Sequence, residues 1–154
     1  MFIGDLLEPR AVLAKASGGT KRQVLSATAD AAARLYGLDA QGVLDGLLER
    51  EAAGSTGVGY GVAIPHARIP GLDRTLGLFL KLESPVPFEA VDDQPVDLLF
   101  VLLSPDDGGV DHLRALARVS RLLRQADLRA QLRQARGAET VLALLGRDAQ
   151  PSAA

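Results

Sequence analysis

The chain contains two histidines, which are the side chains best suited to chemistry near neutral pH. His66 follows Pro65 at the end of the stretch GSTGVGYGVAIPH. A neutral imidazole keeps one nitrogen free to attack or to bind, while the other donates a hydrogen bond that fixes the tautomer. Four roles therefore remain open for His66: general base, metal ligand, phosphoryl acceptor, or a surface histidine without a function.

His112 is the second candidate, because it follows Asp111 where the pattern predicts the first turn of a helix. Helix N-termini present unpaired N–H groups and a partial positive charge, and both favour anions. His112 is thus suited to steadying a phosphate, although its position alone slightly favours a boundary residue packed beside Leu113. Neither histidine is followed by further ligands at zinc spacing, so the sequence predicts no metal site.

Arginines are the natural partners for an anion held at either histidine. Arg50 lies at the expected end of a helix, just before the glycine stretch, where it also complements the helix dipole. Its guanidinium could grip two oxygens of a phosphate beside His66. A second set, Arg114, Arg118 and Arg121, forms one flank of a later helix. This flank is interpreted as a solvated surface first, and only secondarily as a docking patch for an acidic partner.

Glycines crowd the segment that precedes His66, at positions 54, 57, 59 and 61. They do not form a Walker A loop, because Tyr60 rather than lysine follows Gly59, and they do not form a GxGxxG pattern. Glycine permits unusual backbone angles and close approach of a ligand or another segment. A tight, irregular entry into a strand explains them equally well.

The composition limits the function classes. With 154 residues and a formal charge of −2, the chain is expected to form one domain without a chain-wide role in binding nucleic acid or membrane surfaces. The absence of cysteine excludes disulfides and thiolate catalysis. The N-terminal sequence lacks a secretory pattern, and the longest apolar run, 98–103, is far shorter than the ~20 residues that span a bilayer. A cytoplasmic location is expected.

Two helices are predicted in the first third of the chain. Thr20 and Gln23 form a capping-box pattern before a run with helical periodicity, and Gly37 ends that run. Asp39 is suited to cap a second helix, which is expected to close at Gly54.

Strands are predicted in the middle third. Residues 62–64 form a short apolar segment, and residues 76–82 alternate like a strand that is covered on one face only. Residues 96–104 are apolar on both faces, which is typical of a central strand. Three prolines within 83–95 predict a loop between the last two strands.

Helices are predicted again in the last third. Asp111 is expected to cap a long helix, and Leu122 fits its predicted apolar stripe poorly. That stripe consists of Leu113, Leu116, Ala117, Ser120 and Leu123. Asp127 starts a further helix, and residues 138–145 form a last one. Helices around one apolar sheet predict the α/β class, as a single-domain sandwich over residues 1–146 with a flexible tail at 147–154.

Three segments together resemble a known family. They are LLEREAAGSTGVGYGVAIPHARIPGLD, FEAVDDQPVDLLFVLLSP and DHLRALARVSRLL, and the resemblance covers roughly residues 3–146. They are similar to the enzyme IIA domains of the mannitol–fructose class in bacterial phosphoenolpyruvate-dependent phosphotransferase systems. The similarity is greatest to the stand-alone, nitrogen-related branch.

The resemblance implies a mixed β-sheet with helices on both faces and a phosphoryl relay without a cofactor. His66 is then the phosphorylated residue, which receives the group on Nε2 from an HPr-type carrier protein. His112 matches the second family histidine, and Arg50 matches the arginine before the glycine stretch. Tyr60 departs from the family pattern, where a polar or charged residue is common, and this departure could alter partner contact.

Phosphoryl transfer needs positioning and charge stabilisation rather than an elaborate set of reacting groups. Beside Arg50 and His112, exposed N–H groups of the glycine stretch, including Gly57, are candidates for supporting the phosphate. Ser55 and Thr56 could add hydroxyl donors, or they could simply cap or turn the chain. Three roles remain open: a regulatory phosphocarrier, a sugar-transport component that passes phosphate to a IIB protein, and a non-catalytic domain on the same fold.

Overall fold

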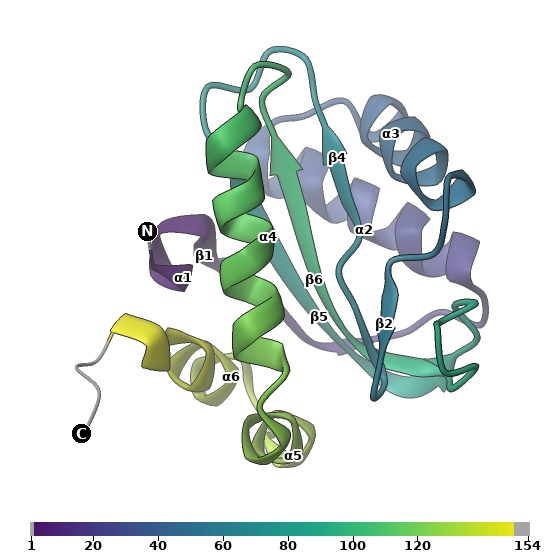
Figure 1. Ribbon diagram of the computed structural model, residues 1–154, viewed down its shortest axis with the longest axis vertical. Coiled ribbons are helices and arrows are strands. Elements are labelled where there is room, and N and C mark those ends of the chain that lie inside the picture. Colours follow the sequence, from purple (N-terminus) through teal and green to yellow (C-terminus); the bar gives the residue numbers. More distant parts are fainter. Residues whose placement is uncertain (1, 150–154) are drawn as a thin grey trace.

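The strand Val96–Ser104 (β6) is the centre of a six-stranded sheet (Figure 1). In the computed structural model, which describes residues 2–149, this strand is buried along nearly its whole length. It pairs antiparallel with Leu76–Val86 (β5) on one side. On its other side it pairs in parallel with two short strands, Val62–Ala63 (β3) and His66–Arg68 (β4). The predicted central strand is confirmed.

Two further strands complete the sheet in the order β1-β5-β6-β3-β2. Leu7–Ala16 (β1) pairs in parallel with β5, and Gly57–Gly59 (β2) pairs antiparallel with β3. Parallel and antiparallel pairs thus occur in one sheet, which confirms the expected mixed topology. The strand β1 was not predicted, because Pro9, Arg10 and Lys15 interrupt any alternation of apolar and polar residues along it.

Helices cover both faces of this sheet, as expected. Lys21–Tyr36 (α2) and Ala40–Ala52 (α3) lie behind it in Figure 1, and Gly109–Leu123 (α4) crosses its front. Near the bottom of that view lie Ala126–Gln134 (α5) and Ala138–Leu145 (α6). A short helix Ile3–Leu6 (α1) precedes β1, and the 3-10 turn Gly146–Ala149 (η1) follows α6.

The local signals that begin and end α2 and α3 act largely as predicted. The Thr20 hydroxyl accepts the N–H of Gln23, and Gly37 ends α2 in the left-handed conformation at φ 68°. The Gln23 side chain reaches back to the N–H of Gly19 rather than to that of Thr20. Asp39 accepts the N–H of Gly42 at the start of α3. These caps orient α3, whose last turn carries Arg50.

Two strand predictions were wrong in detail. Strand β5 extends to Val86, so the predicted loop at 83–95 begins later than expected. It is also covered on both faces, since Gly77 and Phe79 are as buried as the leucines that alternate with them. Helices on both sides of the sheet produce this burial, which the alternating pattern alone does not reveal.

The predicted buried face of α4 was wrong in part: Leu123 is buried and Leu116 is partly buried as expected, but Leu113 and Ala117 are exposed. Its buried residues are His112, Ala115, Val119, Leu122 and Leu123, whereas Leu113 is 65% exposed. The N-cap is Gly108, and Asp111 lies inside the first turn. Both stripes have helical spacing, so only contact with the sheet decides between them. The observed face turns the imidazole of His112 inward.

The strand pairing beside β6 is interrupted at Ile64 and Pro65, between β3 and β4. This interruption sets the position of His66. The prediction put His66 after a strand, but it is the first residue of β4, where it pairs with Leu102 near the carboxyl end of β6. Pro65 lies between the two short strands and accepts the N–H of Leu102 through its carbonyl group. His66 therefore lies on a backbone that β6 holds on both sides of the break.

Among residues 2–149, no helix is both long and apolar enough to span a bilayer. The expected flexible tail at 147–154 lies partly outside the described residues. Within the described part, residues 146–149 form the turn η1.

Candidate active site

The imidazole of His66 has a defined tautomer. Its Nδ1 lies 2.9 Å from the carbonyl oxygen of Ile64, which can only accept a hydrogen bond, so Nδ1 carries the proton. The Nε–H of Arg50 donates to Nε2 of the same ring over 3.1 Å. Nε2 therefore keeps its lone pair. The interruption at Pro65 brings the Ile64 carbonyl back toward the ring two residues later, and so determines which nitrogen keeps its lone pair.

Arg50 is held between the glycine stretch and His66. One of its terminal nitrogens, Nη1, donates to the carbonyl of Gly54 over 2.8 Å, while Nε faces His66. This carbonyl lies just beyond the end of α3, so the guanidinium bridges the helix end and the imidazole. A cation is thereby fixed at the nitrogen that keeps its lone pair.

His112 approaches the His66 ring from α4, on the face of the sheet opposite to the α3 helix that carries Arg50. Its ring centroid lies 5.4 Å from that of His66, with the two planes tilted by 52°. Nδ1 of His112 lies 2.6 Å from the hydroxyl of Ser104, the last residue of β6. The structure thus brings His66, His112 and Arg50 together from β4, α4 and α3.

These three side chains line a cleft of about 480 Å³, together with Arg68 and Glu49. Arg68 was not singled out from the sequence. It lies two residues after His66 in β4, and residues at that spacing share one face of a strand. Its Nη1 donates to the carbonyl of Asp106 over 3.0 Å, which holds a second guanidinium at the cleft. Recognition of residues 66–68 as a strand would have found it.

Burial lowers the pKa of His66 below the ordinary value of 6.5, and the Arg50 cation lowers it further. The hydrogen bond to Ile64 and the charge of Glu51 act in the opposite direction. Burial also lowers the pKa of His112, to which His66 and Arg68 add. Both rings are therefore neutral at pH 7, so that His66 keeps a nucleophilic nitrogen and His112 donates one N–H.

The chain matches a known family over nearly its whole length. Residues 5–147 match the family described as "Phosphoenolpyruvate-dependent sugar phosphotransferase system, EIIA 2". The chain belongs to this family. As an enzyme IIA chain, it is a component of a phosphoenolpyruvate-dependent phosphotransferase system.

Relatives of this enzyme IIA chain place it in the nitrogen-related branch. It is 47% identical over 145 residues to a nitrogen regulatory protein of Bradyrhizobium diazoefficiens, a match that covers 94% of this chain and 95% of the relative. The crystal structure of the nitrogen regulatory protein IIA-Ntr from Neisseria meningitidis superposes with a TM-score of 0.88 at 34% identity, covering 93% of this chain and 98% of the other. A fructose-specific EIIA component of Haloferax volcanii is 42% identical over 103 residues, 67% of each chain.

Hydrogen bonds from Ser55 and Thr56 hold the backbone of the glycine stretch beside the site in this enzyme IIA chain. The Ser55 hydroxyl donates to the carbonyl of Phe88 over 2.6 Å and also accepts the N–H of Gly57. The Thr56 hydroxyl donates to the carboxylate of Glu51, which also accepts the N–H of Thr56. In this structure, the hydroxyls of Ser55 and Thr56 and the N–H groups of Thr56 and Gly57 are thus engaged away from the His66 ring.

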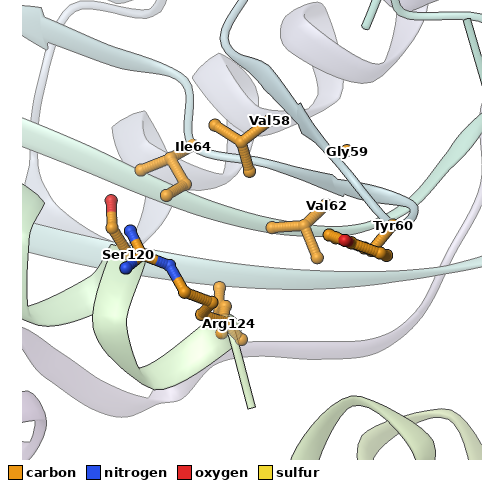
Figure 2. Close-up of a pocket in the computed structure, with 8 residues that line it drawn as sticks. Val58, Gly59, Tyr60, Val62, Ile64, Ser120 and Arg124 are labelled. Atoms are coloured by element: carbon orange, nitrogen blue, oxygen red, sulfur yellow. The ribbon is translucent and has the colours of Figure 1, made fainter. Parts of the chain in front are cut away.

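Among the other clefts of the enzyme IIA chain is a smaller one of about 140 Å³. It lies between the β2–β3 hairpin and the C-terminal half of α4, where Val58, Val62 and Ile64 face Ser120 and Arg124 (Figure 2). This lining carries no carboxylate or imidazole. Within residues 2–149, no three His, Asp or Glu side chains gather as a metal site would require. Of these two clefts, only the one described above contains the two histidines.

Proposed function

We propose that the chain is a regulatory phosphocarrier in which Nε2 of His66 accepts a phosphoryl group from the phosphohistidine of an HPr-type protein. The observation that supports this most directly is the environment of the ring. Its Nδ1 proton is bound to the Ile64 carbonyl, and its free Nε2 faces the Arg50 guanidinium on an open cleft. The proposal requires the chain to work in the cytoplasm, together with its donor.

The transfer exchanges one nitrogen–phosphorus bond for another. The lone pair of His66 Nε2 forms a bond to phosphorus while the bond to the donor's imidazole nitrogen breaks, and that nitrogen leaves with the electron pair. His66 keeps the proton on Nδ1 throughout, so its ring gains positive charge as the bond forms. The Ile64 carbonyl, 2.9 Å away, stabilises that charge.

The surrounding cations and N–H donors stabilise the negative charge on the transferred phosphoryl group. The transition state spreads negative charge over three oxygens, which favours fixed cations and N–H donors. Arg50 moves from contact with Nε2 to contact with the oxygens, because the new phosphorus atom occupies its present place. The neutral His112 ring donates an N–H from the other side of the cleft, and Arg68 adds a second positive charge.

A shallow site suits a relay. A partner's phosphohistidine must reach His66 directly, and the cleft is bounded by the end of α3, by β4 and by the first turn of α4. The engaged hydroxyls of Ser55 and Thr56 hold the glycine stretch in shape, which leaves room for the partner. Side chains that serve transfer are gathered here, and this favours a working carrier over a non-catalytic domain.

A regulatory role is favoured over sugar transport. The relative that matches nearly the full length of this chain is named a nitrogen regulatory protein, whereas the fructose-specific relative matches two thirds of it. Incubation of the phosphorylated chain with candidate IIB proteins separates the two roles. Rapid loss of phosphate to a IIB protein would support transport instead.

The test of the carrier function is labelling with radioactive phosphoenolpyruvate in the presence of enzyme I and an HPr-type protein. The wild-type chain is expected to acquire acid-labile, base-stable phosphate, and His66→Ala is expected to acquire none. The circular dichroism spectrum of the variant shows whether it has folded. Full labelling of a folded His66→Ala chain would move the acceptor elsewhere and overturn the assignment.

A further inference from the structure

Ser104 is a buried hydroxyl that the proposed transfer does not use directly. It ends the central strand β6 and has no exposed surface. Its Oγ lies 2.6 Å from Nδ1 of His112, and the hydroxyl of Thr75 donates to it over 3.3 Å. Thr75 is also buried. The hydroxyl of Thr75, the residue just before β5, and that of Ser104 at the end of β6 thus form a short series of hydrogen bonds that ends at the imidazole.

The donor and acceptor of each of these hydrogen bonds follow from a count of the protons available. A serine hydroxyl has one proton to donate and two lone pairs that accept. Thr75 fills one lone pair, and among residues 2–149 the only other polar partner of Ser104 Oγ is Nδ1 of His112. A buried hydroxyl proton without an acceptor is costly, so the Ser104 proton belongs on the bond to Nδ1. Nδ1 then accepts, and Nε2 carries the ring proton.

The ring geometry gives this tautomer a function. The two nitrogens of an imidazole point in divergent directions, so a ring whose Nδ1 points at the buried Ser104 turns Nε2 away from the interior. His112 lines the cleft, and its ring centroid lies 5.4 Å from that of His66. The proton on Nε2 is thus available to an oxygen of a phosphoryl group carried by His66.

We propose that Ser104 is a positioning residue: its hydroxyl, oriented by Thr75, donates to Nδ1 of His112 and so holds Nε2–H toward the phosphoryl site. The functional consequence rests on the proposed carrier role of His66. The tautomer itself does not, because the hydrogen bonds exist without phosphate.

The arrangement complements that of His66. In His66, a backbone carbonyl accepts from Nδ1–H and leaves Nε2 as the nucleophile. In His112, a hydroxyl donates to Nδ1 and makes Nε2 the donor. The two facing rings therefore present opposite polarities at Nε2, one to phosphorus and the other to its oxygens. This difference is set by what lies behind each ring and not by the histidines themselves.

The test is to read the tautomer of His112 by long-range ¹H–¹⁵N correlation spectra of the labelled chain near pH 7.5. The wild type is expected to show Nδ1 at an unprotonated-type shift and Nε2 at a protonated-type shift. Ser104→Ala and the isosteric Thr75→Val should both give shifts averaged between the two tautomers. Thr28→Val is the matched control, since Thr28 is an equally buried hydroxyl that bonds to Val24 inside α2. It should leave the His112 shifts unchanged.

Phosphoryl transfer provides the second measurement. Ser104→Ala should slow labelling of His66 roughly three- to tenfold, less than the ~10²-fold typical when a pre-organised donor is removed outright. Ser104→Thr, which retains the hydroxyl, should recover most of the rate. Thr75→Val keeps the test valid if Ser104→Ala does not fold.

The outcomes separate the two proposals. If wild-type His112 carries its proton on Nδ1, or if its tautomer survives in Ser104→Ala, the positioning role is wrong even when His66 is labelled normally. If His66 is never labelled while the tautomer behaves as expected, the carrier function fails and the hydrogen-bond assignment stands. An altered tautomer with an unchanged transfer rate would overturn the functional part of the inference.

Discussion

The Nε–H of Arg50 donates to Nε2 of His66 over 3.1 Å, so the nitrogen proposed to bind phosphorus lies against a fixed cation. The same guanidinium is anchored to the Gly54 carbonyl through Nη1. Because Arg50 lies in the last turn of α3, its position depends on a helix end rather than on a mobile loop.

Replacement of Arg50 by lysine should slow labelling of His66 by about tenfold or more, because an ammonium group cannot hold Gly54 and two phosphoryl oxygens at once. Rapid-quench measurement of phosphate transfer from the HPr-type donor gives the rate. Arg121→Lys is the matched control, since Arg121 is an exposed arginine in the last turn of α4. Equal rates for both variants would remove Arg50 from the site.

The variant His112→Ala should retain the fold but transfer phosphate roughly 10²-fold more slowly, as expected for loss of one pre-organised donor. His112→Gln supplies an amide N–H at a similar reach and should be less impaired. The rate is measured as for Arg50, with thermal unfolding as the check on folding. A rate for His112→Ala within twofold of wild type would reduce His112 to a packed boundary residue.

The acceptor activity of His66 should persist at pH values where an ordinary histidine is already protonated. Burial and Arg50 lower the pKa of His66 below 6.5, so its nucleophilic neutral form survives further into acid. Replacing Arg50 with methionine removes one of these causes and should raise the pKa of His66. NMR titration of the His66 ring measures both values. A wild-type pKa above 6.5 would contradict the described environment.

The free energy of unfolding should fall as the pH is lowered below 6.5. Both histidines have a lower pKa in the folded chain than in the unfolded chain, so the unfolded state binds more protons below 6.5. Their contribution to the free energy of unfolding is complete above 6.5 and is lost as the pH falls through the folded pKa values. Urea unfolding between pH 7.5 and 5 measures this loss, which should shrink in the double variant His66→Gln/His112→Gln. An unchanged slope would assign the loss to carboxylates.

The carboxylate of Glu51 should be important for stability. It lies 2.9 Å from the Lys21 ammonium and accepts from both the N–H and the hydroxyl of Thr56. Removing one partner of a buried pair leaves the other uncompensated, so Glu51→Gln should lower the free energy of unfolding by about 3 kcal/mol. Glu89→Gln is the control, because Glu89 is 84% exposed and lies 3.6 Å from the same ammonium. Similar losses for the two variants would contradict the distinction.

Arg68→Ala should weaken transfer only a few-fold, because Arg68 lines the cleft but is bonded to the Asp106 carbonyl rather than to His66. It should also raise the pKa of His112, which the charge of Arg68 lowers. Comparison of transfer rates at low and high salt measures the charge contribution, which should fall in the variant. A loss as large as that of Arg50→Lys would make Arg68 a principal phosphate ligand.

The sequence by itself determined the elements whose signals are local. Thr20, Gly37 and Asp39 act over three or four residues, so both ends of α2 and the start of α3 could be predicted from them. The unbroken apolar run of β6 likewise indicated a strand covered on both faces. The candidate residues His66, His112 and Arg50 came from residue chemistry together with the motifs around them.

Only the tertiary structure decided how these residues meet. The buried face of α4 depends on which side contacts β6, because two stripes of equal periodicity compete, and that choice turns His112 inward onto Ser104. The tautomer of His66 depends on a carbonyl brought round by the break at Pro65. Arg68 lines the cleft because the short strand that carries it, β4, pairs with β6. Local capping signals fix where α2 begins and ends, whereas contacts between elements distant in sequence fix the direction in which each side chain points.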